Sequence, residues 1–306
     1  MCGLFGFSTY GTSPIRDVAK LVNALAQESA VRGIDATGIA YCRDGRIQVQ
    51  KEALSAYKMN FKPPQAVRAL IGHTRHSTQG SEKKNYNNHP FTGKAGGTRF
   101  ALAHNGVLTN DEALKVQYHL PQTKIETDSY IAVQLIEQQR KLNFDSLRHM
   151  VETVRGSFSF SILDDRDNLY LVKGDSPLSI LHFPKEKLYV YASTDEILYR
   201  ALIETPLFAS IKDKAYEVIG LDAGTILKIK SDGKPEQEEF AMQYNMGKRW
   251  YEYGWSMPTI TTHHDDEYIE ELRRFACYAG FDPEIVDELI GEGFSPFEVE
   301  EYIYAG

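Results

Sequence analysis

The chain begins with the sequence MCGLFGFS (residues 1–8), which places a cysteine directly before a run of mostly apolar residues. Residues 2–8 are predicted to form a buried β-strand. The stretch has no basic region and no long apolar segment of the kind that marks a signal peptide, so we expect it to belong to the folded protein.

The position of Cys2 suits its thiol to act as a catalytic nucleophile. Removal of Met1 would place the thiol beside a free α-amine, whose pKa of about 7.7–8.0 suits a general base near neutral pH. An N-terminal nucleophile of this kind carries its own base. The alternative is that Cys2 is a small buried residue in the first strand, and the stretch alone leaves both interpretations open.

Five segments downstream are rich in glycine and in polar residues that commonly take part in catalysis. They are residues 31–38, 71–80, 88–91, 103–110 and 126–129. Each segment taken singly has a structural alternative. Arg75 would suit a surface ion pair, Asn105-Gly106 a tight turn, and Thr127-Asp128 a helix cap.

Together and in this order, the segments resemble the motifs of class II glutamine amidotransferases, the N-terminal-cysteine branch of the Ntn hydrolases. The matching pieces are Cys2-Gly3, Arg32-Gly33-x-Asp35-x-x-Gly38, Gly72-His73-Thr74-Arg75-x-Ser77-Thr78, Asn88-His89-Pro90, His104-Asn105-Gly106 and Thr127-Asp128-Ser129. The resemblance covers about residues 2–230. It implies an α+β fold, the four-layer αββα sandwich of the Ntn hydrolases, followed here by a small helical C-terminal unit.

The resemblance also implies the chemistry of the site. Cys2 would attack the side-chain amide of L-glutamine and form a γ-glutamyl thioester, with release of ammonia and then of glutamate. The side-chain amide of Asn105 and the backbone N–H of Gly106 would stabilise the tetrahedral intermediate. Arg75 would bind the α-carboxylate of glutamine and Asp128 its α-ammonium group.

Further residues take roles by the same resemblance. His76, Ser77 and Thr78 are expected to contribute to substrate binding, and Arg32, Gly33, His89 and His104 to support the site. A histidine in a strand is usually a structural hydrogen-bonding residue, and the α-amine of Cys2 already supplies a base. The chain departs from the family at His76, where tyrosine or tryptophan is commoner, and Gln79 stands at a variable position. Because of these departures, the sequence does not assign the chain to one subfamily.

The pattern between the motifs predicts strands alternating with a few long helices. Strands are expected at residues 37–42, 46–49, 70–74, 99–104, 157–163, 169–172, 179–183, 188–192 and 225–229, the last of them closing the domain. Asp44-Gly45 predicts a two-residue hairpin turn. One helix should begin at Ser13-Pro14 and stop near Gly33, and another should span residues 128–142. Two sheets with helices on their outer faces follow from this pattern.

Composition narrows the class of protein. The 306 residues are 42% hydrophobic and 25% charged, which is typical of a globular protein, and no run of about 18 apolar residues predicts a membrane span. The three cysteines, Cys2, Cys42 and Cys277, are too few and too scattered for a disulfide framework or a zinc site, and Cys42 is expected in the core. We expect a cytoplasmic protein that needs no metal and no cofactor. A net charge of −8 argues against nucleic-acid binding.

The charge is concentrated at the C-terminal end. Residues 262–306 hold 13 acidic and 2 basic residues, a net charge of −11, which leaves +3 for the rest. We therefore predict a catalytic domain at residues 1–239, an aromatic linker at 240–264 and an acidic three-helix unit at 265–306. Two of its helices should open at Asp282-Pro283 and at Ser295-Pro296.

The 66 residues after position 240 are too few for the synthase domains that well-known members carry. The expected protein is a stand-alone subunit that supplies ammonia to a partner synthase. A Cys-type Ntn amidohydrolase with another amide substrate, and a catalytically silent binding module with this fold, are the alternatives.

Overall fold

The computed structural model describes residues 2–11, 15–242, 269, 272–273, 276, 281–292, 294, 299 and 302–303. The chain divides into two compact units, Met1–Tyr244 and Asn245–Gly306. In the second unit, helix α9 (Glu284–Gly291) follows Asp282-Pro283 directly, as predicted. The predicted linker and the other two helices of the acidic unit lie largely outside the described residues.

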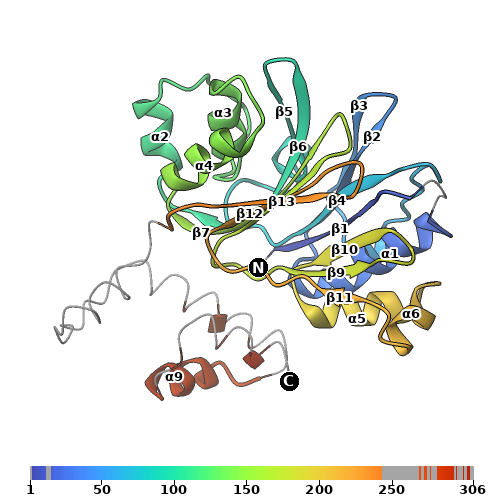
Figure 1. The fold of residues 1–306 in the computed structure, drawn as a ribbon. Helices are drawn as coiled ribbons and strands as arrows, with labels where there is room; N and C mark the ends of the chain where they lie inside the picture. Colours follow the sequence, from blue (N-terminus) through green and yellow to red (C-terminus); the bar gives the residue numbers. More distant parts are fainter. Residues whose placement is uncertain are drawn as a thin grey trace, which may run out of the picture. The chain divides into compact units, whose positions relative to one another are not determined.

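The strands of the first unit form two sheets in which all neighbouring strands are antiparallel (Figure 1). The first sheet has the order β11-β9-β10-β1-β4-β2-β3. Its strands are β1 (Gly3–Thr9), β2 (Ala36–Arg43), β3 (Arg46–Glu52), β4 (Ala69–Arg75), β9 (Ser179–Phe183), β10 (Leu188–Ala192) and β11 (Glu217–Val218).

The second sheet has the order β13-β12-β8-β7-β6-β5. Its strands are β5 (Phe91–Ala95), β6 (Thr98–Leu108), β7 (Gly156–Asp164), β8 (Leu169–Lys173), β12 (Thr225–Ile229) and β13 (Pro235–Glu239). An apolar core between the sheets draws buried side chains from both, among them Leu4 and Ile71 from the first and Ala103 and Leu171 from the second.

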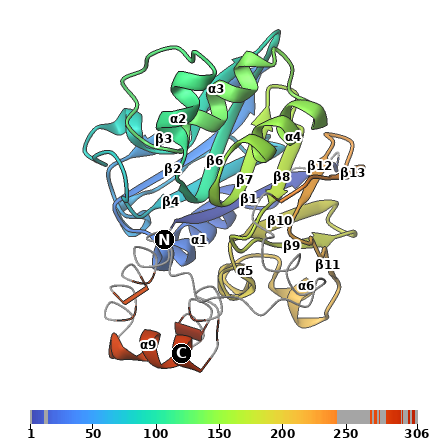
Figure 2. The ribbon, with the colours of Figure 1, turned by 90° about the vertical axis from the view of Figure 1, so that its left-hand side faces the viewer.

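Helices cover the outer faces of both sheets (Figures 1 and 2). The second sheet is covered by α2 (Asp111–Gln117), α3 (Tyr130–Gln138) and α4 (Phe144–Thr153), which share a buried core with it. The first sheet is covered by α1 (Val18–Glu28) and α5 (Asp195–Ile203), followed by α6 (Phe208–Lys212). Short 3₁₀ turns lie at Ser29–Arg32, Ala56–Lys58 and Asn85–Asn87. This is the predicted four-layer αββα sandwich.

Local signals predicted some boundaries well. Asp44 and Gly45 both have positive φ angles, 52° and 68°, as the predicted hairpin turn between β2 and β3 requires. The start predicted at Ser13-Pro14 lies outside the described residues, and α1 itself begins at Val18 with the Asp17 side chain as its N-cap. The helix predicted to reach residue 142 ends at Gln138, and Arg140 beyond it has a left-handed φ of 54°.

Three strands of this unit, β5, β11 and β13, and four helices, α2, α4, α5 and α6, were not predicted. Strand β5 is an edge strand whose Thr92 and Lys94 are exposed, and β13 is an acidic edge strand paired with β12. The strand at residues 225–229 is therefore not the last. Polar edge strands lack the apolar alternation that identifies a half-buried strand, so their pairing cannot be inferred locally. Helices α2, α4 and α5 are short, and each is stabilised by packing one buried face onto a sheet or helix.

Candidate active site

Cys2 directly precedes β1, and its backbone and its thiol have separate contacts. Arg32 donates from Nε to the carbonyl oxygen of Cys2 at 2.8 Å. The thiol lies 3.5 Å from the carbonyl oxygen of His76 and donates to it. Burial raises the pKa of the thiol, against the opposing charge of Arg75. The resting thiol is therefore protonated near neutral pH, and a base must remove its proton before it can attack.

Arg75 is the last residue of β4 and is 3% exposed. Its Nη1 donates to Oδ1 of Asn88 at 2.7 Å, and its Nη2 donates to the carbonyl oxygens of Gln79 and Gly80 at 2.6 and 2.7 Å. A guanidinium has five N–H donors. These contacts fix the group through three oxygen atoms and leave Nε–H and one Nη1–H for other acceptors.

The segment after Arg75 is tied to the turn that precedes β2. The backbone N–H of Ser77 donates to Oδ2 of Asp35 at 2.7 Å, while the backbone N–H of Asp35 donates to the carbonyl oxygen of Arg75 at 3.0 Å. A Cβ at Gly33 would lie 2.3 Å from the carbonyl carbon of Arg75, so the close approach of the two segments requires glycine there. His76 and Thr78 are exposed.

Strand β6 carries Asn105 and Gly106 beside β7. Gly106 has a φ of 129°, and a Cβ there would lie 2.1 Å from the carbonyl oxygen of Ser157. Only glycine fits this backbone without displacing β7. Asn105 is 2% exposed, and its Nδ2 is buried without a hydrogen-bond partner among the described residues. A buried amide donor of this kind is costly unless it serves a ligand or a reacting group.

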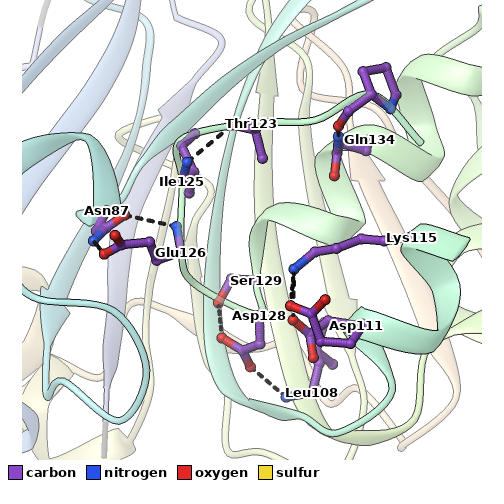
Figure 3. Close-up of polar contacts among 12 residues, drawn as sticks. Asn87, Leu108, Asp111, Lys115, Thr123, Ile125, Glu126, Asp128, Ser129 and Gln134 are labelled. Atoms are coloured by element: carbon purple, nitrogen blue, oxygen red, sulfur yellow. Dashed lines mark hydrogen bonds and ion pairs between the residues drawn. The ribbon is translucent and has the colours of Figure 1, made fainter.

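Asp128 lies just before α3 and is 4% exposed. Its Oδ2 accepts from the backbone N–H of Leu108 at 2.6 Å, and its Oδ1 accepts from the Ser129 hydroxyl at 3.2 Å (Figure 3). The Ser129 oxygen also lies 2.8 Å from Nδ1 of His104. The charges of Asp128 and Arg75 both act on the Cys2 thiol. One buried anion and one buried cation therefore lie near the same sulfur atom.

Three histidines form a buried group beside these residues. Nε2 of His73 lies 2.9 Å from the carbonyl oxygen of His104, which connects the two sheets next to Asn105. The rings of His73 and His89 lie 4.1 Å apart. Burial lowers the pKa of His73 to about 3 and also lowers the pKa values of His89 and His104. All three are neutral at pH 7 and are poor bases.

The described residues hold no group of three or more His, Cys, Asp or Glu side chains suited to a metal ion. Among the same residues, no helix combines the length and the apolar character that crossing a bilayer requires. Cys42 is buried, as predicted, and burial raises the pKa of its thiol to about 11.

The predicted site residues thus lie close together, and the structure adds contacts that the sequence analysis missed. Asp35 holds Ser77, and Asn88 holds Arg75. Asp35 and Asn88 both belong to the sequence motifs described above. The motifs therefore pointed to these residues, but their contacts with Ser77 and Arg75 were not predicted. Lys51, which donates to the carbonyl oxygens of Asn88 and Pro90, lies outside every motif.

Comparison with known proteins agrees with this geometry. Residues 73–200 match the family model described as a glutamine amidotransferase domain. The glutamine–fructose-6-phosphate aminotransferase of Halalkalibacterium halodurans is 32% identical over 188 residues, 59% of this chain and 30% of the relative. The enzyme of the same name from Bacillus cereus is 30% identical over 241 residues, 76% of this chain and 38% of the relative. The chain thus spans about a third of the length of these relatives.

Solved structures show the same fold. The glutamine phosphoribosylpyrophosphate amidotransferase of B. subtilis matches with a TM-score of 0.62 and 21% identity, over 79% of this chain and 50% of that one. At this level of identity the likeness concerns the architecture of the paired sheets and their helices.

Proposed function

Because the chain carries a class II glutamine amidotransferase domain, as its motifs predicted, we propose that it hydrolyses the side-chain amide of L-glutamine with Cys2 as the nucleophile. The observation that carries this proposal is a pair of opposite buried charges, Arg75 at the end of β4 (3% exposed) and Asp128 just before α3 (4% exposed). A free amino acid has one carboxylate and one ammonium group, so this pair suits it better than it suits a peptide or a neutral amide.

The proposed mechanism uses only groups of this chain and water. After removal of Met1, the α-amine of Cys2 takes the thiol proton, and the sulfur attacks the amide carbon of glutamine. The Asn105 amide and the Gly106 N–H stabilise the resulting oxyanion. The C–N bond then breaks, the α-ammonium returns its proton to the leaving nitrogen, and ammonia departs. Water hydrolyses the γ-glutamyl thioester to glutamate and regenerates the thiol.

The histidines have structural roles in this proposal. Since burial lowers the pKa values of His73, His89 and His104, none of them is suited to take the thiol proton near pH 7. His104 instead supports Ser129 and Asp128, while Arg32 and Gly33 shape the backbone around Cys2 and Arg75. His76, Ser77 and Thr78 complete the rim of the substrate subsite.

The ammonia is proposed to pass to an acceptor on a partner synthase. Two of the relatives are named as glutamine–fructose-6-phosphate aminotransferases, a name that joins glutamine to an acceptor. The acidic segment at residues 262–306, with a net charge of −11, suits a partner with a basic surface.

A glutaminase assay on untagged protein that begins at Cys2 tests the proposal. We expect glutamate and ammonia to be released from L-glutamine, with little activity on L-asparagine or on glutaramide, which lacks both α charges. Comparable rates on glutaramide would indicate an amidohydrolase for a different substrate. No turnover of any amide would indicate a binding module.

Arg75→Ala and Asp128→Ala should mainly weaken glutamine binding. Loss of one charge-assisted contact predicts a rise in KM of about 10- to 100-fold, with a smaller change in kcat. Steady-state kinetics measure both constants. Arg46→Ala, at an exposed position on β3, is the control and should leave KM unchanged. Unchanged KM in both site variants would contradict the assignment of Arg75 and Asp128.

Truncation tests the proposed docking role of the C-terminal segment. The cut should follow Tyr244, because Phe240 is 8% exposed, packs in the core of the second sheet and donates its N–H to the carbonyl oxygen of Gly224 at 2.8 Å. We expect the truncated protein to hydrolyse glutamine at the rate of the full chain and to lose a co-purifying synthase. Precipitation or loss of glutaminase activity would mean that the segment belongs to the catalytic core.

A further inference from the structure

Lys51 is a partly buried cation whose contacts lie next to the proposed site. It stands on β3, where the flanking Gln50 and Glu52 are exposed. Its Nζ donates to the carbonyl oxygens of Asn88 and Pro90, the latter at 3.1 Å. Its own carbonyl oxygen accepts from Nδ2 of Asn85 at 2.7 Å. Lys51 therefore contacts both ends of residues 85–90.

The register of the first sheet explains why this segment can reach Lys51. Gly38 on β2 lies opposite Lys51 on β3. A Cβ at Gly38 would lie 2.2 Å from the carbonyl oxygen of His89 and 2.6 Å from Cβ of Lys51. The absence of a side chain at Gly38 lets residues 88–90 pack directly onto β2, within reach of the Lys51 ammonium.

Asn88 connects this contact to Arg75. Its backbone carbonyl accepts from Lys51, and its side-chain Oδ1 accepts from Nη1 of Arg75 at 2.7 Å. Its Nδ2 donates to the carbonyl oxygen of Glu82 at 2.8 Å and to Oδ1 of Asn85 at 3.1 Å. Asn88 is completely buried, so its side chain cannot reorient freely while its backbone is held. A continuous path of hydrogen bonds thus runs from Lys51 through Asn88 to Arg75.

We propose that Lys51 is a positioning residue for substrate binding: its ammonium holds the backbone of residues 88–90 so that Asn88 fixes the guanidinium of Arg75. The inference rests on the proposed function, because it takes Arg75 as the group that binds the α-carboxylate of glutamine. Lys51 acts through Asn88 and makes no contact with the reacting atoms in this proposal.

The surroundings of Lys51 make the contact sensitive to pH. Its described neighbours are the like charge of Arg75, the buried imidazoles of His73 and His89, and the ring of Phe91, whose centroid lies 5.1 Å from Nζ. The hydrogen-bond partners that the structure describes for its ammonium are carbonyl oxygens, and they include no carboxylate. Burial, together with the charge of Arg75, lowers the pKa of Lys51 to about 8. A neutral amine is the weaker donor, so the contact should weaken as the pH rises through 8.

The experiment compares Lys51→Met, Lys51→Arg and the wild type in glutamine hydrolysis. Methionine keeps an apolar stem and removes the charge, so K51M should raise KM about tenfold at pH 7 with kcat changed by less than about twofold. Gln50→Met introduces the same side chain at the exposed neighbouring position and should change neither constant.

The pH profile and a double mutant separate positioning from a general loss of structure. Above pH 8 the wild-type KM should rise relative to that of K51R, since arginine stays charged and titration of glutamine itself is common to both. The effects of K51M and Asn88→Ala on KM should not add, because both changes interrupt one path.

An unchanged KM in K51M, or a fall in kcat alone, would overturn the inference. Additive effects of K51M and N88A would also overturn it. If K51M does not fold, the proposal is tested by the dependence of KM on pH in the wild type and in K51R. Parallel dependence of the two KM values across pH 8 would count against the proposal. Absence of glutaminase activity in the wild type would instead reject the proposed function itself.

Discussion

Replacing Cys2 with alanine should abolish glutamine hydrolysis while the protein stays folded. The thiol is the only group at this position that can form the γ-glutamyl thioester, so we expect a loss of about 10³-fold or more in kcat. Its hydrogen bond to the carbonyl oxygen of His76 is long, at 3.5 Å, and its loss should cost little stability. Release of glutamate measures the rate, and intact mass should show that the active protein has lost Met1.

Cys42→Ala is the matched control for Cys2→Ala. Cys42 lies on β2 of the first sheet, is 9% exposed, and donates from its thiol to the carbonyl oxygen of Asp165 at 3.3 Å. Burial raises the pKa of Cys42 to about 11, and as an internal residue Cys42 has no α-amine of its own to take the thiol proton. C42A should therefore keep full activity. Glutaminase activity in C2A, or an active protein that retains Met1, would contradict the mechanism.

The order of the motifs was enough to predict the fold family and its layers. Local patterns then predicted the central strands, because β1, β4 and β10 are buried along their whole length and are rich in apolar residues. The edge strands β5 and β13 were missed because they are polar, and their ladders depend on partners elsewhere in the chain. Sheet order could not be predicted either: β4 pairs with both β1 and β2, and this placement is a property of the whole sheet.

The candidate site was predicted residue by residue from the resemblance, whereas its internal contacts were not. Sequence position says nothing about the hydrogen bond that Arg75 donates to Asn88, whose two partners lie 13 residues apart in the chain. Lys51 is the clearest case. On an alternating strand a lysine is expected at the surface, and its partial burial follows from the missing side chain of Gly38 opposite it. Such contacts depend on register and packing, which no local pattern encodes.

Asn105→Ala should reduce kcat by about 10²- to 10³-fold with little change in KM, because the amide donor is used mainly when the oxyanion forms. The side chain is 2% exposed, and its Nδ2 has no partner among the described residues, so alanine deletes an unused donor from the resting protein. Stability should therefore change little, which a thermal melt can verify. Asn105→Asp should be at least as inactive, since a carboxylate would repel the developing negative charge.

Asn110→Ala provides the contrast, because this asparagine is fully engaged in the fold. Its Nδ2 donates to the carbonyl oxygen of Thr153 at 3.1 Å, and its Oδ1 accepts from the N–H of Arg155 at 2.8 Å. Loss of these bonds should lower the melting temperature and leave kcat close to the wild-type value. Comparison of the two variants would then distinguish the catalytic role of Asn105, on β6, from the structural role of Asn110, next to it. If N105A instead raised KM with kcat preserved, as expected for Arg75→Ala, Asn105 would be a substrate-binding residue and the oxyanion would need another donor.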